Sequence, residues 1–383
     1  MRRAYFIGAS SHTSLGRDLA DSLRALEHPP VPQSVTARFA DRDQTVPYRI
    51  LKDDAASDAE ERLYRVLERV IVQALDAAEL TSTERRALGL FIGSSSADIS
   101  VSEARYRREL DSDAKAIALS ASSSLGNLAA ALRERFDFRG PDHSFNTACT
   151  ASANALAYAD ATVRSGRLEH ALVVGVELFN VVTALGFHGL QLLTPDTMKP
   201  FDRARNGLVL GEGCSALVIG SRARHAQPLS LRGSANICDT HSISAAHPDG
   251  STIAHVISGA LRSASLTASE IAAVKVHGTA SLLNDEAEVA GMKRVFTTLP
   301  PLCALKPYLG HTLGACGLNE LALFCAAADR GFLIGTPGIC AGDSDLGITL
   351  NQTSTDLPPG NYMLNYFGFG GNNTSLVIER QGR

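Results

Sequence analysis

The chain lacks the features that define several common classes of protein. Its seven cysteines lie at positions 149, 214, 238, 303, 316, 325 and 340, and none belongs to a C-x-x-C pair. Their odd number and scattered spacing argue against a disulfide framework or a zinc site, so we expect reduced thiols and no metal. No apolar stretch is long enough to span a bilayer. Residues 1–10 contain two arginines but no apolar segment of signal-peptide length, so a cytoplasmic protein is predicted.

A strong charge of either sign is also absent. The formal net charge of -4 over 383 residues gives no reason to expect nucleic-acid binding, and any docking patch for an acidic partner must be local. Hydrophobic residues make up 45% of the chain and charged residues 20%, which is typical of a globular enzyme and not of a disordered protein. The length is sufficient for a large core or two domains.

Strand-like and helix-like segments alternate along the chain. Buried strands are predicted at 5–8, 88–93, 171–177 and 274–277, and helices at 15–26, 59–78, 116–136, 285–296 and 314–330. This alternation indicates an α/β fold with mostly parallel sheets covered by helices. Residues 33–53 are polar and are expected to be irregular. The charged stretch 222–228 ends in proline and predicts a boundary between two halves, 1–220 and 221–383.

Cys149 lies in the alanine-rich run Phe145–Leu156, where a short strand is predicted to end and a helix to begin. A thiol at a helix N-terminus feels the positive end of the helix dipole and the free N–H groups there. Both favour the thiolate, which is the nucleophilic form. A buried core thiol is the alternative for this cysteine alone. Segments 276–279 and 306–314 each add a histidine, as a cysteine acyl-transfer site needs, so Cys149 is predicted to be a nucleophile.

These three segments, together with 200–213 and 365–373, resemble five blocks of the β-ketoacyl synthase (ketosynthase) family, in family order. Members of this family are the elongating condensing enzymes of fatty-acid and polyketide synthesis. The resemblance covers nearly the whole chain. It implies the thiolase-like fold, in which two similar halves with mixed sheets form a layered α/β arrangement. It also implies an acyl carrier protein as partner, with substrates on its phosphopantetheine and no other cofactor, and a homodimer or heterodimer.

The resemblance also assigns the central chemistry. Cys149 would accept the acyl group from a carrier thioester. His277 and His311 would donate hydrogen bonds to the enolate that forms when a malonyl thioester loses carbon dioxide. Lys306 would orient these groups or act through its charge. The backbone N–H groups of Cys149 and Phe369 would form the oxyanion hole for attack on the acyl group.

Supporting roles follow from the same resemblance. Glu320 is expected to accept a hydrogen bond from the family lysine or to fix the histidines, although an exposed ion pair on a helix is the alternative. Asp285 and Glu288 match an acidic pair and are expected to be structural. Thr279 and Ser281 match hydroxyls that contact the phosphopantetheine arm, with ordinary loop residues as the alternative.

Aromatic residues are expected to shape the acyl pocket. Phe367 and Phe369 would act as its gate, while Phe187 and Tyr366 would line it. Packing in a core strand is the alternative. Tyr366 stands where the family usually has a small residue, so it is expected to change which acyl lengths are accepted.

Several positions depart from the common family pattern. They are Pro307 and Tyr308 after the lysine, Tyr366, Gln191 in place of a basic residue, and the serine-rich surroundings of Ser94. None removes the nucleophile or a histidine. They favour a specialised secondary-metabolism or polyene-type synthase over the housekeeping fatty-acid enzyme.

Two other functions remain open. A chain-length-factor-like partner subunit would shape the product tunnel of a separate ketosynthase and condense little itself, but such proteins usually lack the cysteine present here as Cys149. A hydrolase or thiolase is disfavoured by the two histidine contexts. In any dimer, the apolar strand at 171–176 is predicted to form the seam, because an exposed edge of that composition would otherwise aggregate.

Overall fold

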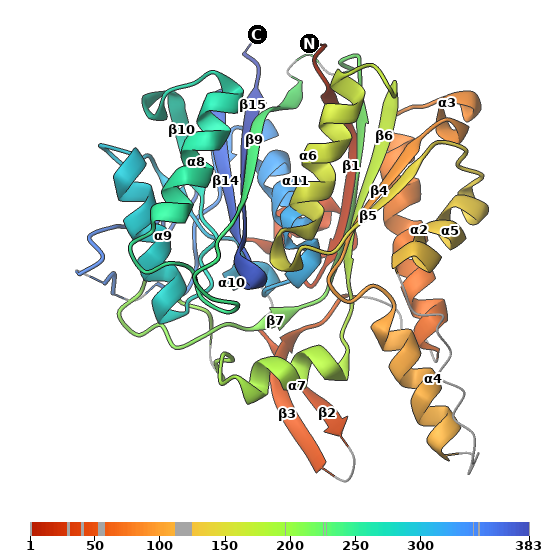
Figure 1. Ribbon diagram of the computed structural model, residues 1–383, viewed down its shortest axis with the longest axis horizontal. Coiled ribbons are helices and arrows are strands. Elements are labelled where there is room, and N and C mark those ends of the chain that lie inside the picture. Colours follow the sequence, from red (N-terminus) through yellow and green to blue (C-terminus); the bar gives the residue numbers. More distant parts are fainter. Residues whose placement is uncertain are drawn as a thin grey trace.

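The computed structural model describes residues 2–28, 31–39, 42–52, 58–111, 125–195, 197–224, 226, 228–339, 341–343 and 345–382. Two five-stranded sheets stand side by side, with helices between them and on both outer faces (Figure 1). The predicted α/β class with mixed sheets in layers is confirmed. No helix within the described ranges is long and apolar enough to cross a membrane.

The first sheet has the order β1-β8-β6-β4-β5. Its strands are β1 (Tyr5–Thr13), β8 (Gly213–Gly220), β6 (His170–Glu177), β4 (Gly89–Gly93) and β5 (Asp142–Phe145). β4 is parallel to both β5 and β6, while β8 is antiparallel to β1 and β6. The predicted dimer seam at 171–176 is therefore wrong: β6 is apolar because it is central and paired on both sides, and the open edge on this side is β5.

The second sheet has the order β11-β10-β14-β15-β9. Its strands are β11 (Leu302–Cys303), β10 (Ile271–Lys275), β14 (Gly360–Phe367), β15 (Asn372–Arg380) and β9 (Leu229–Cys238). β10 is parallel to β11 and β14, while β15 is antiparallel to β14 and β9. Each sheet uses strands from one half of the chain only; the domain boundary at residue 221 stays a prediction.

Helices α6 (Ala151–Arg164) and α11 (Cys316–Asp329) lie between the sheets (Figure 1). Nearly every residue of α11 is buried, which is expected of a helix covered on all sides. The outer helices are α2 (Ala59–Ala77), α3 (Ser82–Arg86) and α5 (Leu125–Phe136) on the first half, and α8 (Ser251–Ala264) and α9 (Leu282–Val295) on the second. Asp58 caps α2 by accepting from the N–H groups of Glu60 and Glu61. Residues 116–124 of the predicted helix 116–136 fall outside the described ranges.

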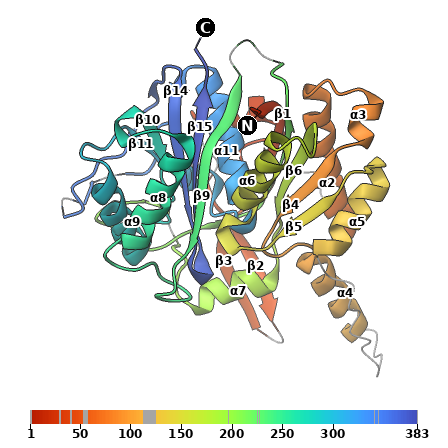
Figure 2. The ribbon, with the colours of Figure 1, turned by 45° about the horizontal axis from the view of Figure 1, so that its top comes forward.

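Residues 33–53 contain regular structure where the sequence predicts none. This segment was expected to be irregular, but β2 (Gln33–Phe39) and β3 (Arg42–Arg49) form a hairpin (Figure 2). This hairpin extends β7 (Leu210–Gly211) into a three-stranded sheet. Ala37, Val46 and Tyr48 are buried on one face, so the strand period is present among the polar residues. The remaining elements are α1 (Leu19–Ala25), α4 (Ile99–Asp111), α7 (Val181–Gly189), α10 (Lys306–Leu309), the β12 (Phe332–Leu333) and β13 (Thr355–Asp356) pair, and the 3₁₀ turns η1 (Ala148–Thr150), η2 (Ala268–Glu270), η3 (Leu313–Ala315) and η4 (Phe369–Gly371).

Candidate active site

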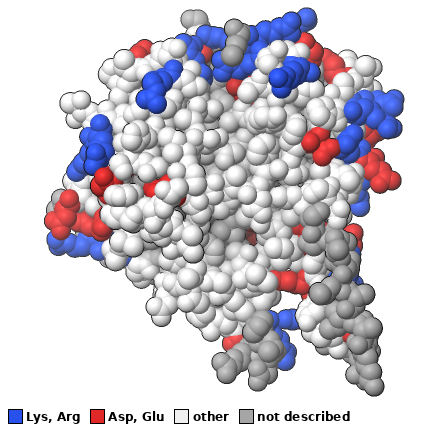
Figure 3. Space-filling model, in the orientation of Figure 1, with Lys and Arg blue, Asp and Glu red and all other residues white. Residues whose placement is uncertain are grey.

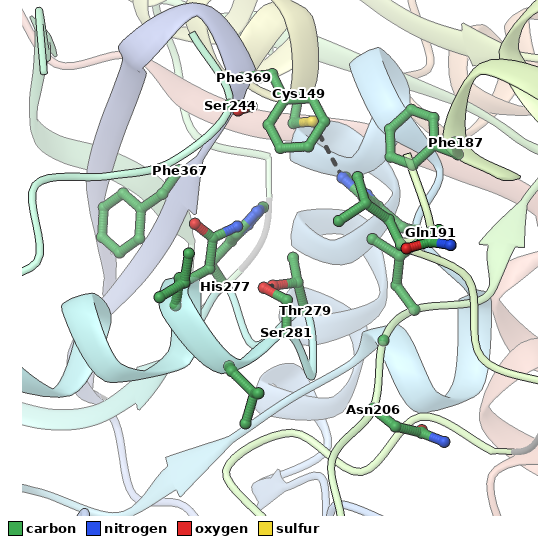
Figure 4. A pocket seen from close by; sticks show the side chains of 17 residues that line it. Cys149, Phe187, Gln191, Asn206, Ser244, His277, Thr279, Ser281, Phe367 and Phe369 are labelled. Atoms are coloured by element: carbon green, nitrogen blue, oxygen red, sulfur yellow. Dashed lines mark hydrogen bonds between the residues drawn. The ribbon is translucent and has the colours of Figure 1, made fainter. Parts of the chain in front are cut away.

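A cavity of about 250 Å³ lies where loops of the two halves meet. Cys149 enters it from η1, His277 from the loop after β10, and His311 from the segment between α10 and η3. Figure 4 shows the cysteine and His277 facing this cavity, with aromatic side chains around them. The three sequence segments predict that these side chains come together, and the fold places all three in one cavity.

Cys149 lies in a tight turn just before α6. β5 ends at Phe145 and α6 begins at Ala151, so the thiol belongs to the intervening turn η1 and not to the helix itself. Ala148 has a φ of 49°, in the left-handed region, which turns the chain sharply just before the cysteine. Cys149 Sγ lies 3.0 Å from Nε2 of His311 (dashed line in Figure 4).

The resting thiol does not have the lowered pKa that the sequence suggested. Burial raises the pKa of Cys149 to about 11, although the Lys306 ammonium and the backbone N–H groups of Phe369 and Cys149 act to lower it. The expectation of a thiolate was wrong because loss of hydration outweighs the helix terminus. At neutral pH the thiol holds its proton, and Nε2 of His311 is within reach to accept it.

The loop that carries Phe369 is fixed by glycine geometry. Gly370 and Gly371 have φ values of 73° and 74°. A Cβ on Gly371 would lie 1.8 Å from the carbonyl oxygen of Asp239, so only glycine fits there. The N–H of Gly370 donates to the carbonyl of Ile243 at 2.7 Å. These contacts hold the Phe369 N–H near the sulfur; its role in an oxyanion hole stays a prediction.

The two imidazoles lie edge to face, with ring centroids 5.6 Å apart. Nδ1 of His277 lies 3.1 Å from Nζ of Lys306. An ammonium only donates, so Nδ1 accepts and the His277 proton is on Nε2. Burial, and then the Lys306 ammonium, hold the pKa of both histidines well below the usual value, so both rings are neutral near neutral pH.

Buried charges support the histidines. Lys306 Nζ donates to Oε1 of Glu320 at 2.8 Å and to the carbonyl of His277 at 2.7 Å, as the sequence analysis expected of Glu320. Lys275 was missed: its Nζ donates to Oε2 of the same carboxylate at 2.5 Å. A lysine inside the apolar strand β10 was the available signal. Burial lowers the pKa of Lys275. Burial also acts to lower the pKa of Lys306, but Glu320, Cys316 and Cys149 together raise it above its usual value.

Asp285 and Glu288 accept hydrogen bonds from backbone N–H groups and do not line the cavity. Glu288 accepts from the N–H groups of His277 at 2.7 Å and Gly278 at 2.9 Å, which fixes the histidine loop. Asp285 accepts from the N–H of Phe201 at 2.8 Å. Burial raises the pKa of Glu288 to about 7 and that of Asp285 to about 8.

Glu177 is a second supporting residue that the sequence did not reveal. Glu177, at the end of β6, accepts from the N–H groups of Ser95 at 2.9 Å, Ser96 at 2.8 Å and Gly314 at 2.9 Å. It therefore ties the serine run after β4 to the turn that follows His311. The serine-rich surroundings of Ser94 are explained by this carboxylate.

The cavity walls are largely apolar. Phe187 stacks on Phe369 with centroids 5.6 Å apart, and Phe367 lines the side next to His277. Thr279 and Ser281 also line the cavity, and their hydroxyl oxygens are 3.1 Å apart. Gln191 lies in the wall as well.

Four exposed apolar side chains either line the cavity or are next in sequence to residues that line it; we call Leu190, Ile243, Leu282 and Leu283 the apolar rim. Leu282 and Leu283 line the cavity and are 55% and 61% exposed. Leu190 (60%) and Ile243 (84%) are sequence neighbours of lining residues. An apolar group of this kind is typical of a contact surface.

Tyr366 does not line this cavity, contrary to the prediction. It is fully buried, its hydroxyl donates to the carbonyl of Gly317 at 2.9 Å, and Lys275 Nζ lies 3.7 Å from the centre of its ring. Successive residues of a strand face opposite sides. Because Phe367 faces the cavity, Tyr366 on the same strand β14 faces away from it, toward α11.

Comparisons with known proteins agree with this geometry. Two protein-family models match the chain. The one described as "Beta-ketoacyl synthase, N-terminal domain" matches residues 34–225, and the one described as "Beta-ketoacyl synthase, C-terminal domain" matches residues 230–339. The 3-oxoacyl-[acyl-carrier-protein] synthase 2 of Vibrio harveyi is 27% identical over 81% of this chain and 80% of that protein. An oxytetracycline polyketide β-ketoacyl synthase of Streptomyces rimosus is 28% identical over 67% of this chain and 64% of its own length.

Solved structures are similar over the full chain. A β-ketoacyl synthase from Burkholderia phymatum has a TM-score of 0.86 and 26% identity, and all of both chains is covered. A chain from the complex of a ketosynthase (ApeO) with its chain length factor (ApeC) from Xenorhabdus doucetiae has a TM-score of 0.86 and 25% identity, over 99% of this chain and 98% of that chain.

Proposed function

Because the chain belongs to the β-ketoacyl synthase family, we propose that it condenses an acyl group held on Cys149 with a malonyl group by decarboxylative Claisen condensation. The observation that carries the proposal is the contact of 3.0 Å between Cys149 Sγ and His311 Nε2, with the neutral His277 beside it in the same cavity.

The first half-reaction loads the enzyme. As Sγ attacks the carbonyl carbon of an acyl thioester, the thiol proton passes to Nε2 of His311. The N–H groups of Cys149 and Phe369 stabilise the oxyanion. When the tetrahedral intermediate collapses, the carrier thiolate leaves and takes the proton from His311. A proton acceptor is needed because the thiol pKa is about 11.

The second half-reaction forms the carbon–carbon bond. The malonyl thioester loses carbon dioxide, and its enolate oxygen accepts hydrogen bonds from Nε2–H of His277 and of His311. During loading the neutral His311 carries its proton on Nδ1, which no described residue holds, so after Cys149 is acylated the ring can exchange this proton through solvent and carry it on Nε2. The enolate carbon attacks the acyl carbonyl, and the oxyanion forms at the same two backbone N–H groups. When this intermediate collapses, the Cys149 thiolate leaves and takes up a proton from solvent, which balances the loss of carbon dioxide from the malonyl carboxylate.

The substrates come on a partner. We propose that an acyl carrier protein docks at the apolar rim and that its phosphopantetheine passes Thr279 and Ser281, whose hydroxyls contact the arm. The reaction, written this way, uses no metal and no further cofactor. A reduced Cys149 is required throughout, which suits the cytoplasm.

We propose that the chain pairs through the edge strand β5 with a second copy or with another ketosynthase-like subunit. β5 leaves one edge unpaired within this chain. Charged side chains are sparse over α6 in the middle of this face and gather at its periphery (Figure 3). Tyr158 of α6 is 44% exposed there and packs on Phe145 of β5. A monomer with full activity would refute this pairing.

A role as chain-length-factor-like subunit is the second candidate, since one similar structure is a ketosynthase in complex with its chain length factor. Such a subunit would need neither a nucleophile nor paired histidines, and here Cys149, His277 and His311 are all in contact with one cavity. The enzyme is therefore preferred, and the departures at Gln191 and Tyr366 favour a polyketide or polyene pathway over housekeeping fatty-acid synthesis.

The deciding experiment is intact-mass spectrometry of the chain after incubation with acyl carrier proteins of different acyl length. An adduct equal to the acyl group, lost in Cys149→Ala and discharged by malonyl carrier protein, is expected. Absence of any adduct, alone or with a neighbouring ketosynthase-like subunit, would favour the partner-subunit role instead.

A further inference from the structure

Lys275 is a wholly buried charged residue to which the proposed reaction assigns no part. It ends β10, two residues before His277. Its ammonium contacts Oε2 of Glu320 at 2.5 Å, the carbonyl of Asn365 at 2.8 Å and the face of the Tyr366 ring at 3.7 Å. Burying an ammonium costs free energy unless every hydrogen finds a partner, and here all three do.

Glu320 is shared between two ammonium groups. Lys306 uses its three hydrogens on Oε1 of Glu320, the carbonyl of His277 and Nδ1 of His277. Lys275 occupies the other oxygen, Oε2. Among the described residues, these two lysines are the cations that contact Glu320. Without Lys275, the carboxylate would keep an unpaired buried oxygen, and Lys306 would be the group near enough to satisfy it.

We propose that Lys275 is a positioning residue: by holding Oε2 of Glu320, it leaves a Lys306 hydrogen free for Nδ1 of His277 and so fixes the His277 proton on Nε2, toward the cavity. The step from this geometry to the decarboxylation rate rests on the proposed function.

The second cation also opposes protonation of the histidines. His277 is faced by Lys306, by His311 and, through its backbone, by Glu288. Lys275 is faced by Glu320, Lys306, Tyr366, Cys303 and Cys316. With Lys275 removed, Glu320 is balanced by one cation instead of two, so the positive charge that keeps His277 neutral is reduced.

A test that needs no activity is nuclear magnetic resonance of the imidazole nitrogens in protein labelled with ¹⁵N-histidine. His277→Asn identifies the His277 signals. In the wild type, we expect the proton on Nε2 at all pH values at which the ring is neutral. In Lys275→Met, which replaces the ammonium by an unbranched apolar chain against Tyr366, we expect mixed tautomers and protonation at a higher pH. The same tautomer and titration in both proteins would overturn the proposal.

Kinetics give the second readout. Lys275→Met should slow malonyl decarboxylation roughly tenfold or more at pH 6, as expected when a charge-assisted hydrogen bond is lost, and should leave acyl loading of Cys149 within about twofold. Equal losses in both rates, with an unchanged His277 tautomer, would mean a structural role only. If the wild type neither loads nor decarboxylates, the proposed function fails, and the resonance measurement still decides the tautomer.

Two further variants complete the design. Lys293→Met makes the same substitution at a lysine of α9 that donates to the carbonyl of Leu346 outside the cavity, and it should change neither rate. If Lys275→Met does not fold, Lys275→Gln retains a neutral donor for Glu320 in the same place. We then expect a smaller decarboxylation defect and a partial tautomer change, and the absence of both overturns the proposal.

Discussion

The two walls of the cavity are built by different means. Around Cys149, position is set by backbone shape: a left-handed Ala148, a close approach by Gly368, and N–H groups aimed at the sulfur. Around His277, position is set by buried charge, with Lys306 and Glu288 holding the ring and its loop. Placement of the thiol therefore depends on steric fit, whereas placement and protonation of the imidazole depend on the balance of buried ions.

The largest effect should come from removing the sulfur. We expect Cys149→Ala to abolish covalent acyl loading. Malonyl decarboxylation should continue, because His277 and His311 are unchanged. Alanine fits the turn, so the melting temperature should be close to that of the wild type. Intact mass and carbon dioxide release measure the two reactions. Any acyl adduct on the alanine variant would show that the nucleophile lies elsewhere.

Removing one imidazole should affect acyl loading and malonyl decarboxylation differently. His277→Ala should slow decarboxylation by about 10²–10³, the usual effect of one lost oxyanion donor, and change loading by only a few-fold. His311→Ala should slow both steps, because Nε2 of His311 also contacts Cys149 Sγ. Single-turnover rates of each step would test this. Equal loss in both steps for His277→Ala would contradict the division of roles.

The buried carboxyl group of Asp285, behind the His277 side of the cavity, should make the free energy of unfolding depend on pH. Burial raises the pKa of Asp285 to about 8, so the native state binds a proton that the unfolded chain has released. The stability that this carboxyl contributes is therefore present below its unfolded pKa, near 4, and falls as pH rises through about 8.

Asp285→Asn should remove part of this dependence. The amide oxygen still accepts from the N–H of Phe201, but the group cannot ionise. We expect melting temperatures similar to the wild type at pH 5 and higher at pH 8.5, by about 1 °C for each kcal/mol recovered in a chain of 383 residues. Parallel melting curves across this range would indicate that Asp285 does not titrate.

The smallest effect is expected from changing Phe187, one of the aromatic residues that line the cavity. Phe187 is only partly buried, and its main described ring contact is the stack on Phe369. Phe187→Ala should alter which acyl lengths load onto Cys149, at about 1–3 kcal/mol per methylene of pocket fit, with little change in melting temperature. A loading series over acyl length measures this. An unchanged profile would assign the stack to packing alone.

The sequence predicted best what is local. Cys149, His277 and His311 each lie in a short distinctive segment, so their types and neighbours identified them. Lys275 was missed because its significance depends on Glu320, 45 residues later in the chain, and on burial that the strand pattern alone does not reveal. The pKa of Cys149 was misjudged for the same reason, since desolvation is set by the whole fold.

Two errors could have been avoided with elementary geometry. Tyr366 and Phe367 are adjacent on β14, and strand alternation forbids both from lining one cavity. The apolar segment 171–176 is typical of a central strand covered on both faces, whereas the shorter, more polar β5 has the composition of an edge. In both cases the general family resemblance was applied without the strand period that the residues themselves provide.

The apolar rim has a consequence for work with the purified protein. Its four large apolar side chains are exposed to water when nothing is docked there, so covering them with any available apolar surface is favourable. Self-association through this face would compete with a carrier during titration, so the apparent affinity should weaken as the protein concentration rises. Mild nonionic detergent should compete with the carrier for the rim, whereas added salt should have little effect, since the contact contains few ions to screen.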